Sequence, residues 1–210
     1  MSILAIDPSL TCFGMALIDT PTMVVGDMRL AQAACIRTKK ESGKRKIFVA
    51  DDDARRADEL ARGLLAKIEE WQPAAVIVEQ LPGGTQHARS AMTLGITAGV
   101  IAAVRASMLK FSNEVMVWEY LQPSDVRKEL CGKPSASKQD AHAAAIAATG
   151  GALGGYAGDA TAPEIEAIRD CEVLAVAALQ MRMMCAIISV RENQRPSTDF
   201  GMNPVAARPL

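Results

Sequence analysis

The chain has 210 residues, half of them hydrophobic, and its formal net charge is −1. This length and apolar content allow one substantial core, with a short appendage rather than a second full domain. A net charge so close to zero does not demand a polyanionic partner, although local basic clusters can still bind one. We predict a single domain over residues 1–190 and a flexible tail over residues 191–210, which contain three prolines and no periodicity.

Strand-like and helix-like segments succeed one another along the chain. Short apolar runs predict strands at residues 2–7, 14–18, 24–37, 74–79 and 115–118. Helical spacing and capping residues predict helices at residues 54–71, 88–109, from 123 onward, 137–149 and within 164–190. Strands first, and then strands alternating with helices, indicate an α/β fold with a mixed sheet and helices on both faces.

The cysteines and the N-terminus bear on the cellular compartment. Five cysteines are scattered without a CxxC pair, namely Cys12, Cys35, Cys131, Cys171 and Cys185. An odd number in this arrangement argues against a disulfide framework or a structural zinc site. The first apolar run has no basic segment before it and stops at Asp7, so we expect no signal peptide. We expect reduced thiols in the cytoplasm of a bacterium or of a virus-infected host cell.

Two long apolar tracts raise the question of a membrane. Arg105 interrupts one of them, and Gln180 and Arg182 interrupt the other. These residues make both tracts too polar for unpaired membrane spans. We predict that both are buried helices and that the protein has no membrane partner.

Acidic residues stand at the ends of two predicted strands and at the start of the last apolar stretch. Asp7 and Glu79 each follow an apolar run, and Asp170 and Glu172 precede residues 173–179. Acids in such positions are costly to desolvate unless they are paired or bound to metal. Carboxylate oxygens suit Mg²⁺ or Mn²⁺ far better than zinc. The sequence therefore predicts a divalent cation site, and pairs of such ions serve many nucleases.

Six blocks of sequence carry a family resemblance. They are Ile6-Asp7-Pro8-Ser9 through Gly14, Cys35-Ile36-Arg37-Thr38, Val78-Glu79-Gln80, residues 94–100, residues 123–132 with Ser137-Lys138, and residues 174–177. In this order, over residues 3–180, they resemble RuvC-type Holliday junction resolvases of the ribonuclease H-like fold. The resemblance implies a ribonuclease H-like mixed sheet flanked by helices on both faces. It also implies a homodimer that forms through the helix at residues 88–109.

The same resemblance implies a two-metal site. Asp7 and Glu79 are expected to ligate two Mg²⁺ ions, with Mn²⁺ as a substitute, and acids of the last helix are expected to complete the site. The family usually has two acids three residues apart on that helix. An ungapped alignment here places Glu172 on the second and Arg169 on the first, and arginine cannot ligate a cation.

Asp170 is expected to replace the missing acid beside Glu172. Residues two apart in a regular helix point to nearly opposite sides, so both reach one site only if the helix begins there. Glu166 and Asp170, four residues apart on one face, form the competing assignment.

Several basic residues are predicted to meet DNA. Lys138 matches a family lysine near the scissile phosphate, where a cation offsets charge that develops in the transition state. Phosphate contacts are expected from Arg127, Lys128, Lys133 and Arg89. Leu81 stands where the family often has an aromatic residue, so we predict that it acts as an apolar wedge. His142 shares a helical face with Lys138 and is expected to be packed, with proximity to the metals or DNA as the alternative.

These features predict a Mg²⁺-dependent, homodimeric endonuclease that needs no nucleotide cofactor and resolves four-way DNA junctions by paired symmetric nicks. Three alternatives remain open. The first is a broader flap or branch nuclease on the same fold, and the second is a junction-binding protein without catalysis. The third is an actin-like nucleotide-binding protein, disfavoured because no second Gly-rich phosphate loop follows and 210 residues are few for two such lobes.

Overall fold

The computed structural model describes residues 1–41, 48–80, 87–111, 116–154 and 160–181. Within them the chain forms one five-stranded sheet in the order β3-β2-β1-β4-β5. Its strands are β1 (Ser2–Asp7), β2 (Cys12–Asp19), β3 (Arg29–Arg37), β4 (Ala75–Glu79) and β5 (Val117–Leu121). β2 pairs antiparallel with β1 and β3, whereas β1, β4 and β5 run parallel to one another.

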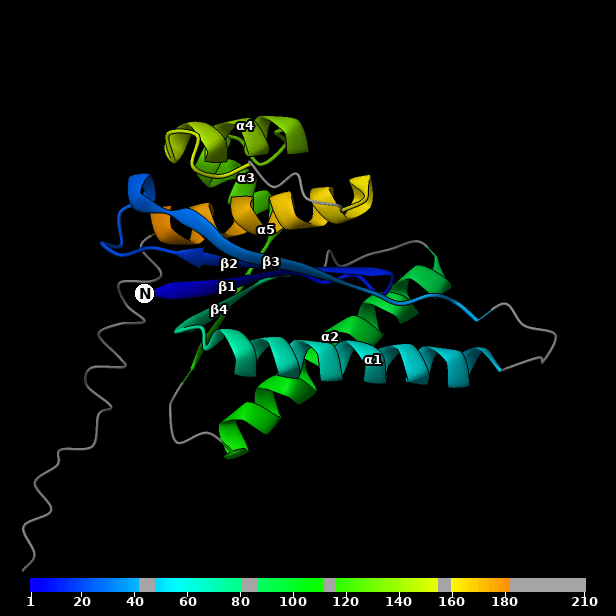
Figure 1. Cartoon of the computed structure of the whole chain (residues 1–210). Coiled ribbons are helices and arrows are strands. Elements are labelled where there is room, and N and C mark those ends of the chain that lie inside the picture. The colour runs from blue at the N-terminus through cyan, green and yellow to red at the C-terminus, as the bar shows by residue number, and fades with distance from the viewer. Residues whose placement is uncertain (42–47, 81–86, 112–115, 155–159, 182–210) are drawn as a thin grey trace, which may run out of the picture.

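Helices cover both faces of this sheet (Figure 1). One face carries α1 (Val49–Trp71) and α2 (Ala88–Phe111), and the other carries α3 (Pro123–Cys131), α4 (Lys138–Ala148) and α5 (Ala162–Gln180). A short 3-10 helix, η1 (Val25–Asp27), precedes β3 and shortens the strand predicted at residues 24–37. The predicted α/β architecture, a mixed sheet flanked on both faces, is confirmed.

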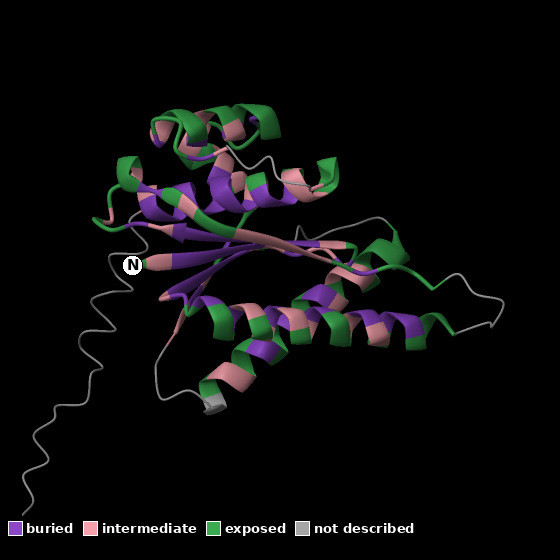
Figure 2. Cartoon of the chain, viewed as in Figure 1, coloured by how far each residue is buried: buried purple, intermediate pink, exposed green. Residues whose placement is uncertain are grey.

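The central strands are buried on both faces, as Figure 2 shows. In β1, Ile3 and Ala5 pack into the core beneath α5, whereas Leu4 and Ile6 pack into the core beneath α1 and α2. Parallel strands with helices on both sides read as near-continuous apolar runs, which is the pattern of β1 and β4. The first charged residue of each strand therefore stands where the strand leaves the core.

Helix α1 begins at Val49, five residues before its predicted start. Asp51 and Asp52 lie in its first turn, where acidic side chains are favoured by the helix dipole. Asp52 and Asp53 are nevertheless buried, and both pair with arginines, Asp52 with Arg55 and Asp53 with Arg89. These acids do not cap the helix, whose N-cap is Phe48, and Asp52 and Asp53 instead hold cationic side chains.

The two apolar tracts differ in burial. Helix α5 is deeply buried, as predicted, but the prediction that α2 is buried is wrong. The most apolar 18-residue window of residues 88–109 has a mean hydropathy of 1.6, yet only 22% of that window is buried. Among the described residues, α2 is the one helix that is long and apolar enough to cross a membrane. A single helix of this kind is weak evidence for a membrane span. It packs against α1 along one side only, through Val100, Ile101 and Val104.

Helix α5 lies directly on β2 because Gly14 has no side chain. A Cβ atom at residue 14 would lie 2.8 Å from the Cβ of Ala167 and 2.9 Å from its carbonyl oxygen. Both distances are shorter than real Cβ contacts, so any side chain at residue 14 would push α5 away from the sheet. Close packing at this point fixes the height of α5 above the strands.

Replacing Gly14 with alanine is expected to destabilise the protein by about 1 to 3 kcal/mol, because the added methyl group overpacks the interface between β2 and α5. Urea denaturation monitored by circular dichroism measures this change. Gly26→Ala is the matched control, since nothing lies within 4 Å of a Cβ atom there. An equal loss of stability in both variants would contradict the close contact with Ala167.

Candidate active site

Asp7 and Glu79 lie side by side at one edge of the sheet. β1 and β4 are parallel neighbours with Ile6 opposite Val78, and each acid is the next residue along its strand. Both side chains are partly buried. The first half of the predicted site is thus two carboxylates at the carboxyl ends of adjacent strands.

Burial, together with the crowding of acids, raises the pKa of Asp7 to about 8. Burial is the largest cause, and the negative charges of Glu79 and Asp170 and a side-chain hydrogen bond with Glu79 add to it. The pKa of Glu79 is also raised, chiefly by burial. Such shifts are expected where carboxylates share a site without a compensating cation.

Asp170 is the acid of the last helix that joins this pair. Nζ of Lys138 donates a hydrogen bond to Oδ2 of Asp170 at 2.7 Å. Nε2 of His142 lies 3.0 Å from Oδ1 of the same carboxylate. Burial alone would raise the pKa of Asp170, but the hydrogen bonds from His142 and Lys138 lower it. The ion pair with Asp170 in turn raises the pKa of Lys138 despite its partial burial.

Helix α4 supplies Lys138 and His142 to the same side of the site. Ser137 caps the helix in a capping box with Asp140, which makes Lys138 its first residue. His142 follows one turn later on the same face. Glu166, one turn before Asp170 on α5, also contacts Lys138 at 3.3 Å.

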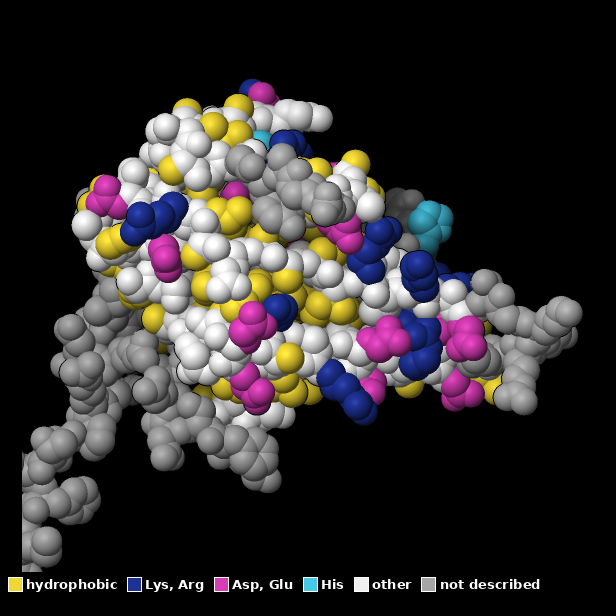
Figure 3. All heavy atoms as spheres, in the orientation of Figure 1, with side chains coloured by type: hydrophobic (Ala, Val, Ile, Leu, Met, Phe, Trp, Pro, Cys, Tyr) yellow, Lys and Arg dark blue, Asp and Glu magenta, His cyan; other side chains and the backbone are white. Residues whose placement is uncertain are grey.

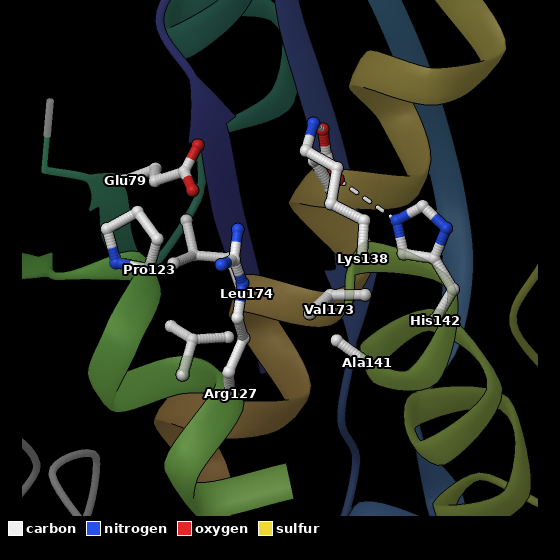
Figure 4. A pocket seen from close by; sticks show the side chains of 10 residues that line it. Glu79, Pro123, Arg127, Lys138, Ala141, His142, Val173 and Leu174 are labelled. Atoms are coloured by element: carbon white, nitrogen blue, oxygen red, sulfur yellow. Dashed lines mark hydrogen bonds and ion pairs between the residues drawn. The ribbon is translucent and has the colours of Figure 1, made fainter. Parts of the chain in front are cut away.

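One pocket brings together side chains from β4, α3, α4 and α5 (Figure 4). It is lined by Glu79, Arg127, Lys138, His142 and Asp170, with Val173 and Leu174 among its apolar walls. Arg127 reaches it from α3, and its charge lowers the pKa of Glu79 against the effect of burial. Cationic side chains therefore flank the strand-end acids from two different helices.

Glu172 points away from this pocket. Its Oε2 accepts a hydrogen bond from the backbone N–H of Gly154 at 3.0 Å, and Oε1 is buried with no partner among the described residues. Burial raises the pKa of Glu172. Helix α5 begins at Ala162, well before these acids, so Asp170 and Glu172 point to different sides of a regular helix. The structure thus brings Asp170 to Asp7 and Glu79, and it does not bring Glu172 there.

The donor chemistry of the site fits a hard divalent cation. Asp7, Glu79 and Asp170 offer carboxylate oxygens, the ligands that Mg²⁺ prefers. The negative charges of Glu79 and Asp170 add to the effect of burial in raising the pKa of Asp7, and a bound cation would offset them. The three acids do not form a finished cage, since no described group of three potential ligands is close enough to hold a metal. Both oxygens of Asp170 are instead engaged by Lys138 and His142.

The residues predicted to contact DNA have different surroundings. Lys128 and Lys133 are exposed on α3 and on the turn that follows it. Arg89 forms a two-pronged ion pair with buried Asp53, at 2.5 and 2.6 Å, so its charge is already compensated. Leu81 lies outside the described residues.

Ion pairs also neutralise the exposed side of α1, where acidic and basic side chains alternate (Figure 3). They join Arg55 to Glu59, Arg62 to Asp58, and Lys67 to Glu70. A surface of balanced charge offers little attraction to a polyanion.

Two contacts go beyond what the sequence predicted. His142 is packed, as expected, and it also contacts the candidate metal ligand Asp170; its spacing from Lys138 was the available signal. The pairing of Arg89 with Asp53 had no local signal, because the two residues are far apart in the sequence.

Asp7 is expected to make the metal-free protein less stable as the pH rises. Its pKa increases from 3.8 in an ordinary side chain to about 8 in the folded protein. Between these values the folded state binds more protons than the unfolded state, so stability falls as the pH rises through this window. Thermal unfolding in a chelating buffer should show this slope, and Asp7→Asn should flatten it and raise the melting temperature at the alkaline end. Asp58→Asn, at an exposed position of α1, should keep the wild-type slope; a flattened slope in this control would refute the assignment to Asp7.

The sequence matches the family described as "Crossover junction endodeoxyribonuclease RuvC" over residues 3–147. A search of curated proteins found no match. Among solved structures, RuvC of Thermus thermophilus has a TM-score of 0.63 and 18% identity, with 88% of this chain and 97% of that chain covered. The same protein in complex with a Holliday junction substrate gives the same score and identity, with 88% and 96% covered.

The yeast mitochondrial Holliday junction resolvase Ydc2 is also similar, with a TM-score of 0.59, 10% identity, and 91% of this chain and 83% of that chain covered. At these identities the structural likeness establishes the fold. The match to the family, which covers well over half of the chain, establishes the family. This protein belongs to the RuvC family of crossover junction endodeoxyribonucleases.

Proposed function

We propose that this protein is a metal-dependent endonuclease that resolves four-way DNA junctions by paired symmetric nicks. One observation carries the proposal: Asp7, Glu79 and Asp170 converge beside Lys138 in a member of the RuvC family. The Thermus thermophilus relative was solved with a Holliday junction substrate, which supports branched DNA as the substrate class.

Asp7, Glu79 and Asp170 are the residues that would hold Mg²⁺, or Mn²⁺ in its place. Bound ions of this kind activate water and stabilise the leaving oxygen of a phosphodiester. Lys138, at the rim of the same pocket, is placed to offset negative charge on the scissile phosphate. Arg127, Lys128 and Lys133 supply phosphate contacts on the α3 side, which give affinity that does not depend on sequence.

Helix α2 supports a two-fold dimer as the active form. Small residues follow its exposed side, namely Gly95, Ala98, Gly99, Ala102 and Ala103. Among the described residues, no atom beyond the helix's own backbone lies within 4 Å of a Cβ atom at Gly95 or Gly99, so a second helix could approach closely there. A two-fold dimer would present two equivalent sites to a nearly two-fold junction, as paired nicks require.

The wild-type protein is expected to nick four-way junctions in the presence of Mg²⁺, and Asp7→Asn is expected to abolish nicking while junction binding persists. Lys138→Ala should reduce the nicking rate about a hundred- to a thousandfold, the usual effect of losing one group that stabilises transition-state charge. Gel assays should compare a four-way junction, a flap and a linear duplex of the same sequence.

Faster cleavage of flaps than of junctions would favour the broader branch nuclease. Junction binding without metal-dependent nicking by the wild-type protein would favour the catalytically inactive alternative.

Gly99→Arg is expected to convert the dimer to a monomer. The position is open within one chain, so the fold tolerates the side chain, but a charged group would block a partner helix. Sedimentation velocity measures the mass, and far-ultraviolet circular dichroism checks folding. Ala147→Arg, at an exposed position of α4 on the opposite layer, is the control and should remain dimeric. A monomeric wild-type protein, or a dimeric Gly99→Arg variant, would refute this interface.

A further inference from the structure

His142 is a partly buried residue whose ring lies against α5. Its side chain is 18% exposed and that of Asp170 is 13% exposed, so solvent competes little for their contact. Nε2 of His142 lies 3.0 Å from Oδ1 of Asp170. A carboxylate only accepts hydrogen bonds, so the proton must be on Nε2.

The two oxygens of Asp170 are held by side chains of different mobility. Oδ1 accepts from the imidazole of His142, whose ring has few rotamers and little exposed surface. Oδ2 accepts from Lys138, a long side chain that is 50% exposed and is shared with Glu166. Oδ2 is therefore the oxygen that can exchange partners, while Oδ1 stays fixed.

The position of His142 on α4 limits its freedom. It lies one turn after Lys138, and only 18% of its side chain is exposed. With one ring nitrogen on Oδ1 of Asp170 and little exposed surface, the imidazole can support this carboxylate.

We infer that His142 is a positioning residue, which fixes the carboxylate of Asp170 through Oδ1 so that Oδ2 is presented to a divalent cation beside Asp7 and Glu79. The inference rests on the proposed function, because it gives Asp170 the role of a metal ligand. Hydrogen-bonded partners of ligating groups orient those ligands, and their loss typically weakens metal binding about 10- to 100-fold.

The test measures Mn²⁺ binding to the DNA-free protein by isothermal titration calorimetry. His142→Ala is expected to weaken Mn²⁺ binding about 10- to 100-fold, and His142→Gln, whose amide can donate to Oδ1, is expected to restore much of it. Asp170→Asn serves as the reference for loss of the ligand itself. Gln139→Ala changes an exposed α4 side chain without touching Asp170 and should bind Mn²⁺ as the wild type does.

Junction affinity in a chelating buffer provides the second readout. It should stay within about twofold of wild type in His142→Ala, because the ring acts on Asp170 rather than on phosphates. In nicking assays the same variant should lower kcat and need more Mg²⁺, with little change in KM for the junction.

Wild-type Mn²⁺ affinity in His142→Ala would overturn the inference, and so would a failure of the wild-type protein to bind Mn²⁺. Equal weakening in His142→Ala and His142→Gln would also overturn it, because the hydrogen bond would then not be what matters. The proposed function can fail separately: a wild-type protein that binds Mn²⁺ with the expected dependence on His142, but does not nick junctions, would refute the nuclease and leave the positioning role intact.

Discussion

Burial of two carboxylates side by side at the ends of adjacent strands is the constraint on which this site depends. Parallel pairing of β1 with β4 places Asp7 beside Glu79, and burial prevents water from screening them. A proton, a cationic side chain or a metal ion must therefore compensate their charge. The helices above this edge of the sheet bring cationic groups to it, Arg127 from α3 and Lys138 from α4. The fold thus concentrates negative charge and surrounds it with positive charge.

The height and rotation of α5 decide how Asp170 enters this arrangement. Contact between Gly14 and Ala167 sets the helix close to β2, and the regular helix from Ala162 onward sets which residues face the strand ends. Asp170 then meets Lys138 and His142 from α4, whose own start is fixed by the Ser137 capping box. Three separate local features, a missing side chain, a helix start and a cap, together bring one carboxylate to the site.

Much of the fold was predictable because its signals are local. Apolar runs that end in an acid identified β1 and β4, and strand-helix alternation identified the mixed sheet. The helix face of Asp170 and Glu172 could not be settled from the sequence, since it depends on where α5 begins. The exposure of α2 could not be predicted either, because a helix rich in small apolar residues has the same sequence pattern whether it packs in the core of one chain or against a second chain. Arg89 could not be assigned to Asp53 because nothing local links a loop-proximal arginine to a distant helix start.

The order of the site along the chain has a consequence for biosynthesis. Asp7 lies near the beginning of the chain, Glu79 in its first half, and Asp170 near the end of the described core. A ribosome therefore releases the first strand-end acid long before the helix that carries Asp170 has been made. Domains fold as units, and contacts between such distant segments form late because loop closure must come first. A growing chain that does not yet include α5 therefore lacks the third carboxylate of the candidate site.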